Sequence, residues 1–315
     1  MSDKIAIRDA YGQALKALGG RNRKVVALEA DVGGSTKSIL LGKEYPDRYF
    51  NVGISELNMV NMAAGLALEG FIPYVNTFAV FMTSRALDPI QSLIAYDSLN
   101  VRLCGTYCGL SDSYDGASHQ AITDVAAMRS IPGMTVISVS DAMETKKAVM
   151  ALSDYKGPVY LRLSRAPHPV IYGDDMKFEI GKGIIHRDGS DITIISTGTI
   201  LHRVLEAADL LEEQGIYATV LDMHTIEPID TELIEKCARR TGAILTVEEH
   251  SVRGGLGSAV AEAAAAACPV PVSILGAETF AESGDLDQLM EKYGYSARNI
   301  AARAREVMFQ RQMTK

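Results

Sequence analysis

The chain has 315 residues with a formal net charge of −8, and 47% of its residues are hydrophobic. This length predicts two domains with separate cores and excludes a small scaffold held together by disulfides. The acidic balance provides no basic field for nucleic acid or an anionic membrane, so small molecules and proteins are the expected ligands.

The first residues, MSDKIAIRDAYG, lack the basic region and apolar core of a secretory signal. No run of about 18 uncharged apolar residues could span a bilayer. We therefore expect a cytoplasmic chain. The cysteines have no neighbouring His/Cys cluster that would complete a zinc site, and we expect them to be buried free thiols. They are Cys104, Cys108, Cys237 and Cys268.

Strand-like runs alternate with helical runs in the first half of the chain. Such alternation predicts parallel strands joined by crossover helices. The pattern loosens over residues 166–183, where prolines, glycines and charges cluster. We therefore predict a first domain over 1–166, a linker over 167–183 and a second domain over 184–315. The expected strands are 25–31, 100–107, 135–140 and 158–164, and the expected helices follow Ser55 and cover 141–153.

The second half repeats the same alternation, so a second α/β domain is the economical interpretation. An Ala-rich run at 261–267 suits close helix packing. The expected strands are 191–197, 217–223, 243–250 and 271–275, and the expected helices are 201–214, 230–240 and 256–267.

The stretch GISELNMVNMAAG places one carboxylate at the start of an apolar segment. Ser55 is a good N-cap, and Glu56 at the first helical position would meet the positive end of the helix dipole. This structural role would by itself explain a carboxylate at position 56. The segment that follows is apolar on more than one side, which predicts a helix buried all round and a Glu56 held at a packed boundary.

Two later segments carry further candidates. NTFAVF supplies two aromatic residues three apart, Phe78 and Phe81, which are core residues on the simplest interpretation. GLSDSYDGASHQ is rich in turn formers and ends near an imidazole, His119, which could equally be a solvated loop residue. Together with Glu56, these segments form a candidate site.

In these segments and over nearly its whole length, the chain resembles transketolase, a thiamine diphosphate enzyme. The resemblance is to the pyrimidine-binding and C-terminal domains, and it implies an α/β fold of two tandem domains with mainly parallel sheets flanked by helices. The quoted motifs run in order from KIAIRDAYGQAL through LEADVGGSTKS, DRYFNVGISELNMVNMAAGLAL and VNTFAVFMTSRALDPI to LCGTYCGLSDSYDGASHQ, VLDMHTIEPID and VEEHSVRGGLGSAV.

The resemblance implies a cofactor role for Glu56. In this family the matching carboxylate hydrogen-bonds N1′ of the aminopyrimidine and favours the imino tautomer that activates the thiazolium. Phe81 matches the aromatic residue that stacks on the pyrimidine, and Phe78 lines the same pocket. Asp31 matches another residue near the cofactor.

The resemblance also implies a sugar site. Asp115 and His119 match groups that hydrogen-bond the hydroxyls beside the reacting carbonyl, and we count His119 with Glu56 as catalytic. The residues matching those that hold the terminal phosphate are Arg8, Ser35 and Arg165, and paired guanidiniums suit a dianion. Two positions depart from the family pattern: Tyr107 replaces a common histidine of the phosphate cluster, and Ser84 replaces a tyrosine of some members.

Full-length members of this family also have a domain that binds the diphosphate through Mg²⁺ or Ca²⁺, which is held by a Gly-Asp-Gly motif and a downstream Asn. Nothing in this sequence resembles that motif in the right context, since Gly173-Asp174-Asp175 lies in the linker. We therefore expect the C-terminal subunit of a split transketolase, which works with an N-terminal subunit carrying that metal site. Family active sites lie between protomers, so we expect an α2β2 assembly with homodimerisation of this chain.

The expected reaction transfers a two-carbon ketol (glycolaldehyde) unit from a ketose phosphate to an aldose. Two alternatives stay open at this point. The nearer is the β subunit of a 2-oxoacid dehydrogenase, for which the Arg8, Ser35 and Arg165 set would have no purpose. The other is a non-catalytic scaffold or regulatory subunit.

Overall fold

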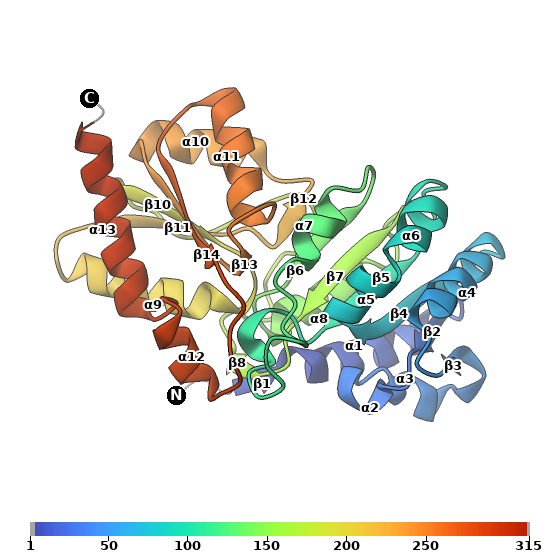
Figure 1. Cartoon of the computed structure of the whole chain (residues 1–315). Helices are drawn as coiled ribbons and strands as arrows, with labels where there is room; N and C mark the ends of the chain where they lie inside the picture. Colours follow the sequence, from blue (N-terminus) through green and yellow to red (C-terminus); the bar gives the residue numbers. More distant parts are fainter. Residues whose placement is uncertain (1–3, 314–315) are drawn as a thin grey trace.

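Two main sheets, each covered by helices on both faces, and one small two-stranded sheet make up the computed structural model, which describes residues 4–313 (Figure 1). The expected α/β class with mainly parallel sheets is confirmed. None of the helices between residues 4 and 313 has the length and apolarity needed to cross a bilayer.

The larger sheet has seven strands in the order β12-β6-β7-β5-β4-β2-β3. The pairs from β6 to β3 are parallel, and β12 joins antiparallel to β6. Parallel strands buried on both faces read as continuous apolar runs, as VVALE does in β2. The strands are β2 (Val25–Glu29), β3 (Tyr49–Asn51), β4 (Ile72–Phe78), β5 (Arg102–Thr106), β6 (Thr135–Ser138), β7 (Val159–Leu163) and β12 (Thr225–Glu227).

An apolar core lies on each face of this sheet, between the strands and the helices that cover them. One core contains residues of α4, α5 and α7, and the other contains residues of α1, α3 and α8. The helices are α1 (Ile7–Arg21), α2 (Gly33–Thr36), α3 (Ile39–Glu44), α4 (Glu56–Leu68), α5 (Ala79–Arg85), α6 (Leu87–Pro89), α7 (Asp124–Arg129) and α8 (Ala142–Ala151), with short turns η1 (Pro46–Arg48), η2 (Ile90–Ala95) and η3 (Gly109–Ser111).

The smaller sheet has five strands in the order β14-β13-β10-β11-β9. All its pairs are parallel except that between β9 and β11. Cores on its two faces hold α9 and α13 on one side and α10 and α11 on the other. The elements are β9 (Ile184–Arg187), β10 (Ile192–Ser196), β11 (Ala218–Asp222), β13 (Ile244–Ser251), β14 (Val272–Ala277), η4 (Gly198–Ile200), α9 (Leu201–Glu212), α10 (Thr231–Thr241), α11 (Leu256–Ala267), α12 (Leu286–Lys292) and α13 (Ala297–Met313).

The two halves are joined by more than the predicted linker. Strand β8 (Pro167–Pro169) pairs antiparallel with β1 (Lys4–Ala6), which ties the start of the linker to the start of the chain. Strand β12 crosses from the second half to the larger sheet. The domain limits drawn from the sequence remain a prediction.

Helix α4 corrects one expectation. It begins at Glu56 as predicted, but it is buried on one face only, because Leu57 is 53% exposed and Leu68 is 69% exposed. Ser55 occupies the N-cap position, yet its hydroxyl donates to the carbonyl of Val52 at 3.1 Å and not to the helix. The apolar character of α4 therefore exceeds what burial within this chain requires.

The cysteines are free, as expected. Cys104, Cys108 and Cys237 are buried, and Cys268 is half-buried.

Candidate active site

The candidate residues follow the carboxyl ends of adjacent parallel strands. Asp31 follows β2, Phe78 ends β4, Tyr107 follows β5 and Arg165 follows β7, while Glu56 lies beyond β3. Loops at this edge of a parallel sheet converge on the same side, where open α/β sheets bind ligands. Residues distant in the sequence therefore come from loops at one edge of the larger sheet.

The loop after β2 is organised by a buried carboxylate, Glu29. It accepts hydrogen bonds from the amide of Val32 at 2.6 Å and from the hydroxyls of Thr36 and Ser38 at 2.9 and 2.8 Å. Asp31 has φ of 62°, an unusual conformation for a non-glycine residue. Its carboxylate accepts a hydrogen bond from Asn51 at 2.9 Å, which links the loop to the end of β3.

Burial raises the pKa of Glu29 from 4.5 to about 7, although hydrogen bonds from Ser38 and Val32 oppose the shift. A raised pKa means that Glu29 stabilises the fold most at acid pH, and this contribution is lost as the pH rises through 7. In Glu29→Gln we expect the unfolding free energy to fall less between pH 5 and pH 8 than in the wild type. Urea unfolding at both pH values measures this difference.

The same change at the exposed Glu213 should leave the pH dependence unaltered. Equal pH dependence in the wild type and in Glu29→Gln would contradict the assignment to Glu29.

Glu56 is 5% exposed at the head of α4, where it accepts a hydrogen bond from Arg85 Nη1 at Oε1, 2.6 Å away. The guanidinium of Arg85 also lies over the ring of Phe81, with its carbon 3.9 Å from the ring centroid. A planar, nitrogen-bearing group is therefore held by the carboxylate and stacked on the aromatic ring. The geometry suits a flat heterocycle that donates a proton or hydrogen bond to Glu56.

Four rings meet at the centre of the site. Phe78 stacks on Tyr107 with centroids 4.1 Å apart and on Phe81 at 5.6 Å. His119 meets both phenylalanines edge-on, at 5.9 Å from Phe78 and 5.2 Å from Phe81. The structure thus brings the predicted imidazole to the predicted aromatic wall.

Beyond these rings lies a cluster that includes Arg8, Ser35 and Tyr107. Arg8 Nη1 donates to the Tyr107 hydroxyl and to the carbonyl of Ser35, the latter at 3.2 Å. Arg8 Nε is buried and has no hydrogen-bond partner within residues 4–313. Tyr107 has φ of 62°, so its backbone adopts a left-handed conformation that aims the phenol at Arg8. An anion could take up the unused donor.

Arg165 is a second arginine near Tyr107. Its Nη1 donates to Asp112 at 2.5 Å and to Asp115 at 3.2 Å, and its guanidinium carbon lies 5.0 Å from the Tyr107 centroid. Burial raises the pKa of Asp112 to about 6, and the hydrogen bond from Arg165 opposes this rise. Arg8 and Arg165 therefore both lie near Tyr107, and Asp112 and Asp115 partly compensate the positive charge of Arg165.

The structure brings all the predicted residues to one edge, in two groups. Glu56 and Asp31 lie toward β3, and the remaining residues gather around Tyr107. The sequence analysis missed Arg85 and Asp112. Arg85 lies four residues after Phe81 on α5, a spacing that places both on one helix face and could have revealed it. Asp112 belongs to the quoted SDSYDG loop and, like Asp115, accepts a hydrogen bond from Arg165, but Asp112 is buried and Asp115 is exposed, a difference that appears only in the folded chain.

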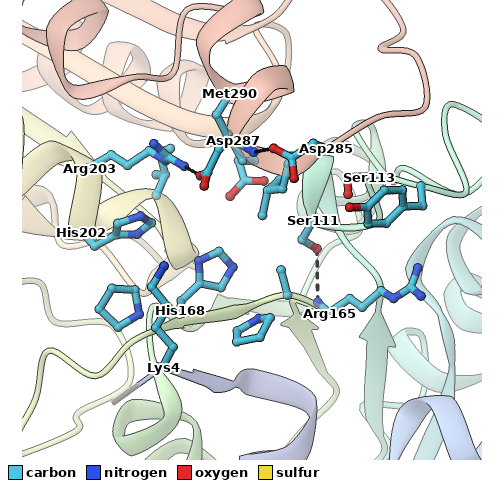
Figure 2. A pocket seen from close by; sticks show the side chains of 17 residues that line it. Lys4, Ser111, Ser113, Arg165, His168, His202, Arg203, Asp285, Asp287 and Met290 are labelled. Atoms are coloured by element: carbon cyan, nitrogen blue, oxygen red, sulfur yellow. Dashed lines mark hydrogen bonds and ion pairs between the residues drawn. The ribbon is translucent and has the colours of Figure 1, made fainter. Parts of the chain in front are cut away.

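A separate cavity of about 300 Å³ lies between the two halves of the chain (Figure 2). Burial lowers the pKa of His168 to about 3 and that of His202 to about 4, so both imidazoles in its wall are neutral. Arg203 and Asp287, which form an ion pair of 2.5 Å, also line this cavity. The cavity shares Arg165 with the predicted set, and in Figure 2 that side chain extends away from His168.

Within residues 4–313, no three His, Cys, Asp or Glu side chains are grouped closely enough to hold a metal ion. The chemistry available from this chain is therefore that of a buried carboxylate, an aromatic wall, an imidazole and two arginines.

Two family models cover most of the chain. The model described as transketolase, pyrimidine binding domain, matches residues 3–169, and that described as transketolase, C-terminal domain, matches residues 181–300.

Individual proteins agree with these matches. The provisionally named transketolase C-terminal section of Methanocaldococcus jannaschii is 42% identical over 306 residues, covering 96% of both chains. A split-gene transketolase solved as an inactive beta4 tetramer has a TM-score of 0.91 and 44% identity, covering 97% of this chain and 99% of that one. Human transketolase is 40% identical over 309 residues, which are 97% of this chain and 49% of the human protein.

Proposed function

The chain belongs to the transketolase family, and we propose that it is the C-terminal subunit of a split, thiamine diphosphate-dependent transketolase. In this proposal it transfers a two-carbon ketol unit from a ketose phosphate to an aldose. The observation that carries the proposal is the buried Glu56, whose carboxylate accepts a hydrogen bond from the guanidinium of Arg85. That planar group lies over the ring of Phe81.

The residues present fit the aminopyrimidine of the cofactor. The Arg85 guanidinium shares with that ring its planarity and its N–H donors, and it is held by hydrogen bonding to Glu56 and by stacking on Phe81. Glu56, Phe81, Phe78 and Asp31 would hold the pyrimidine. Arg85 would then have to release Glu56, and its side chain is 47% exposed and free to move outward.

Thiamine diphosphate supplies, when bound, the carbon nucleophile and the electron sink that ketol transfer needs. The contribution of Glu56 is to accept a hydrogen bond, or hold a proton, at its carboxylate oxygen. Burial keeps water from competing for that oxygen. His119 presents its imidazole beside the aromatic wall, where it can hydrogen-bond a sugar hydroxyl and orient the donor.

The cluster around Tyr107 would bind the distal anionic group of the sugar. Arg8 has an unused buried donor, Nε, and Arg165 flanks the same tyrosine. The carboxylates of Asp112 and Asp115 already bind Arg165, so the site is less cationic than two free arginines would be. Its charge suits a sugar phosphate, or another sugar with an anionic end.

This chain presents residues for the pyrimidine and the sugar, so in our proposal a second subunit binds the diphosphate and the Mg²⁺ or Ca²⁺ ion. The exposed apolar face of α4, beside Glu56, supports an interface there. We propose an α2β2 assembly located in the cytoplasm. The related beta4 tetramer was inactive, which agrees with a requirement for the other subunit in that protein.

Mixing the chain with an N-terminal subunit that carries the Gly-Asp-Gly metal motif tests the proposal. We expect ketol transfer from a ketose phosphate when both subunits, thiamine diphosphate and Mg²⁺ are present, and none from this chain alone. The assay measures the aldose released, with pyruvate decarboxylation measured in parallel. Decarboxylation without ketol transfer would indicate a 2-oxoacid dehydrogenase subunit, and the absence of both activities would favour a non-catalytic subunit.

A further inference from the structure

The loop that carries Asp115 and His119 is built against the second half of the chain. Residues 109–122 receive hydrogen bonds from, or donate them to, two separate segments of that half, which are β13 and the loop before α12. These contacts are Leu110 N to Glu249 Oε2 at 3.1 Å, Gly284 N to Ser113 O at 2.9 Å, Gln120 Nε2 to Glu282 O at 3.3 Å and Ser251 N to Ile122 O at 2.7 Å.

Only one of these four contacts involves a carboxylate, that of Glu249. It lies on β13 and is 5% exposed, and its two carboxylate oxygens accept from different partners. Oε2 accepts from the Leu110 amide of η3, and Oε1 accepts from the hydroxyl of Thr199 at 2.9 Å. A carboxylate this deeply buried is costly unless it is hydrogen-bonded, so the Leu110 contact is part of how the charge is accommodated.

The backbone at the start of the loop fits closely around Glu249. Gly109 has φ of 60°, and a Cβ added there would lie 2.7 Å from the Cβ of Glu249. A side chain at position 109 would therefore be strained by its backbone conformation and would collide with β13. The close approach leaves little freedom in where the loop begins.

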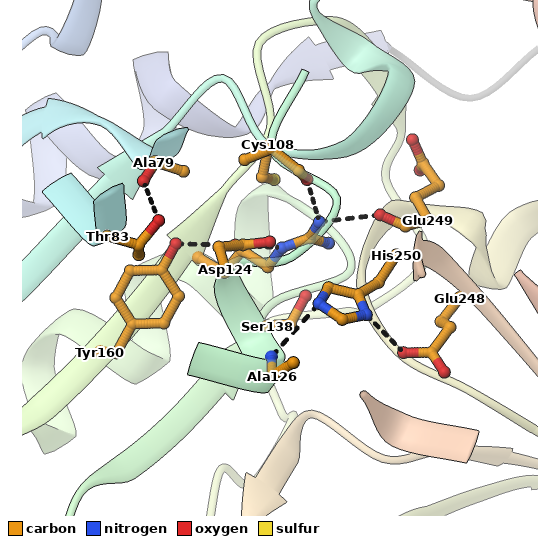
Figure 3. Close-up of polar contacts among 12 residues, drawn as sticks. Ala79, Thr83, Cys108, Asp124, Ala126, Ser138, Tyr160, Glu248, Glu249 and His250 are labelled. Atoms are coloured by element: carbon orange, nitrogen blue, oxygen red, sulfur yellow. Dashed lines mark hydrogen bonds and ion pairs between the residues drawn. The ribbon is translucent and has the colours of Figure 1, made fainter. Parts of the chain in front are cut away.

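A buried arginine, Arg162, also contacts Glu249 and the end of this loop. Arg162 Nη2 donates to the carbonyls of Glu249 and Ala121 at 2.8 and 3.0 Å, and its Nε donates to Asp124 at 2.8 Å. Figure 3 shows Asp124 and Glu249 on the two sides of this network. The start and the end of the loop are thus fixed by one set of buried charges.

We propose that Glu249 is a positioning residue for the sugar-binding loop, and that the second domain thereby shapes the substrate site. This proposal rests on the proposed function. The Glu249 carboxylate holds Leu110, which lies two residues before Asp112. Asp112 in turn binds Arg165, which also binds Asp115. A shift of Leu110 would therefore also move Asp115, which we assign to the sugar hydroxyls, and Arg165, which we assign to the anionic end of the sugar.

The adjacent Glu248 provides a matched control. It is 1% exposed on the same strand, but its carboxylate accepts from Leu256 N and Gly257 N at 2.7 and 2.8 Å, at the start of α11. Figure 3 shows Glu248 directed toward His250, apart from the loop. It is therefore equally buried and charged without touching residues 109–122.

The test compares Glu249→Gln with Glu248→Gln in the chain assembled with its N-terminal subunit. Loss of a charge-assisted hydrogen bond typically corresponds to roughly 10-fold or more in an equilibrium constant. We expect KM for the ketose phosphate donor to rise by about that factor in Glu249→Gln, with a smaller change in kcat. Backbone hydrogen exchange should accelerate in residues 109–120 of that variant and remain as in the wild type for Glu248→Gln.

Gly109→Ala is the second variant, because it displaces the same contact from the loop side while keeping Glu249. It should raise KM and loop exchange in the same direction. The proposal is overturned if Glu249→Gln folds with unchanged KM and unchanged loop exchange, or if Glu248→Gln produces the same changes. A wild-type complex without ketol transfer would instead refute the proposed function, and the exchange comparison would still decide whether Glu249 orders the loop.

Discussion

Replacement of Glu56 by glutamine is expected to reduce ketol transfer by roughly 10²- to 10⁴-fold, the range typical for loss of a general acid–base group. Glutamine keeps the size of the side chain and can still pack at the head of α4. It cannot hold a proton or carry the negative charge that binds Arg85 in the structure. Single-turnover kinetics of the assembled enzyme, with saturating cofactor, measure the loss.

The matched control is Glu69→Gln, at the exposed C-terminal end of the same helix. This variant should keep full activity and the same assembly state. Size-exclusion chromatography of both variants with the partner subunit separates a chemical defect from an assembly defect. Normal turnover in Glu56→Gln would remove the central support of the proposed function.

The fold was largely predictable because its strands are buried on both faces. Largely apolar runs such as VVALE in β2 and ILTV at the start of β13 stand out between Gly-, Pro- and charge-rich turns. Strand β12 was not predictable, because its three residues pair with β6 across the boundary between the halves. A short strand recruited by tertiary contact carries no periodic signal of its own.

The geometry of the candidate site was predictable where an acidic residue lies in an apolar setting, as at Glu56, which is buried as expected; its function stays a prediction. The geometry was not predictable where a side chain is defined by its neighbours. Asp112 and Asp115 have the same chemistry and lie three apart, yet Asp112 is buried against Arg165 and Asp115 is exposed. The role of Glu249 depends on two chain segments that meet only in the folded protein.

The exposed face of α4 also could not be predicted from the sequence. Its composition predicted burial all round, and within one chain Leu57 and Leu68 are exposed. An apolar pattern reports the sum of all burial that a helix undergoes, including burial in an assembly, and does not identify which partner provides it.

The second large effect concerns stability and centres on the Asp124–Arg162 ion pair. Both side chains are buried, the Nε···Oδ2 distance is 2.8 Å, and the Tyr160 hydroxyl also donates to Asp124 at 2.7 Å. Burial alone would raise the pKa of Asp124, but the charge of Arg162 and the hydrogen bonds from Arg162 and Tyr160 hold that pKa below its usual value. The pair is therefore ionised in the folded protein.

Asp124→Ala would leave the Arg162 charge buried without its counter-ion, and we expect the unfolding free energy to fall by about 3–5 kcal/mol. Glu235→Ala, which breaks an exposed pair with Arg239 on α10, should cost far less, because solvent screens exposed charges. Denaturant unfolding at one fixed protein concentration compares the two variants. Because an apolar replacement of both partners removes the stranded charge, Asp124→Ala combined with Arg162→Met should recover part of the loss. A double variant less stable than Asp124→Ala would show that the hydrogen bonds from Arg162 to the carbonyls of Ala121 and Glu249 contribute more to stability than the ion pair does.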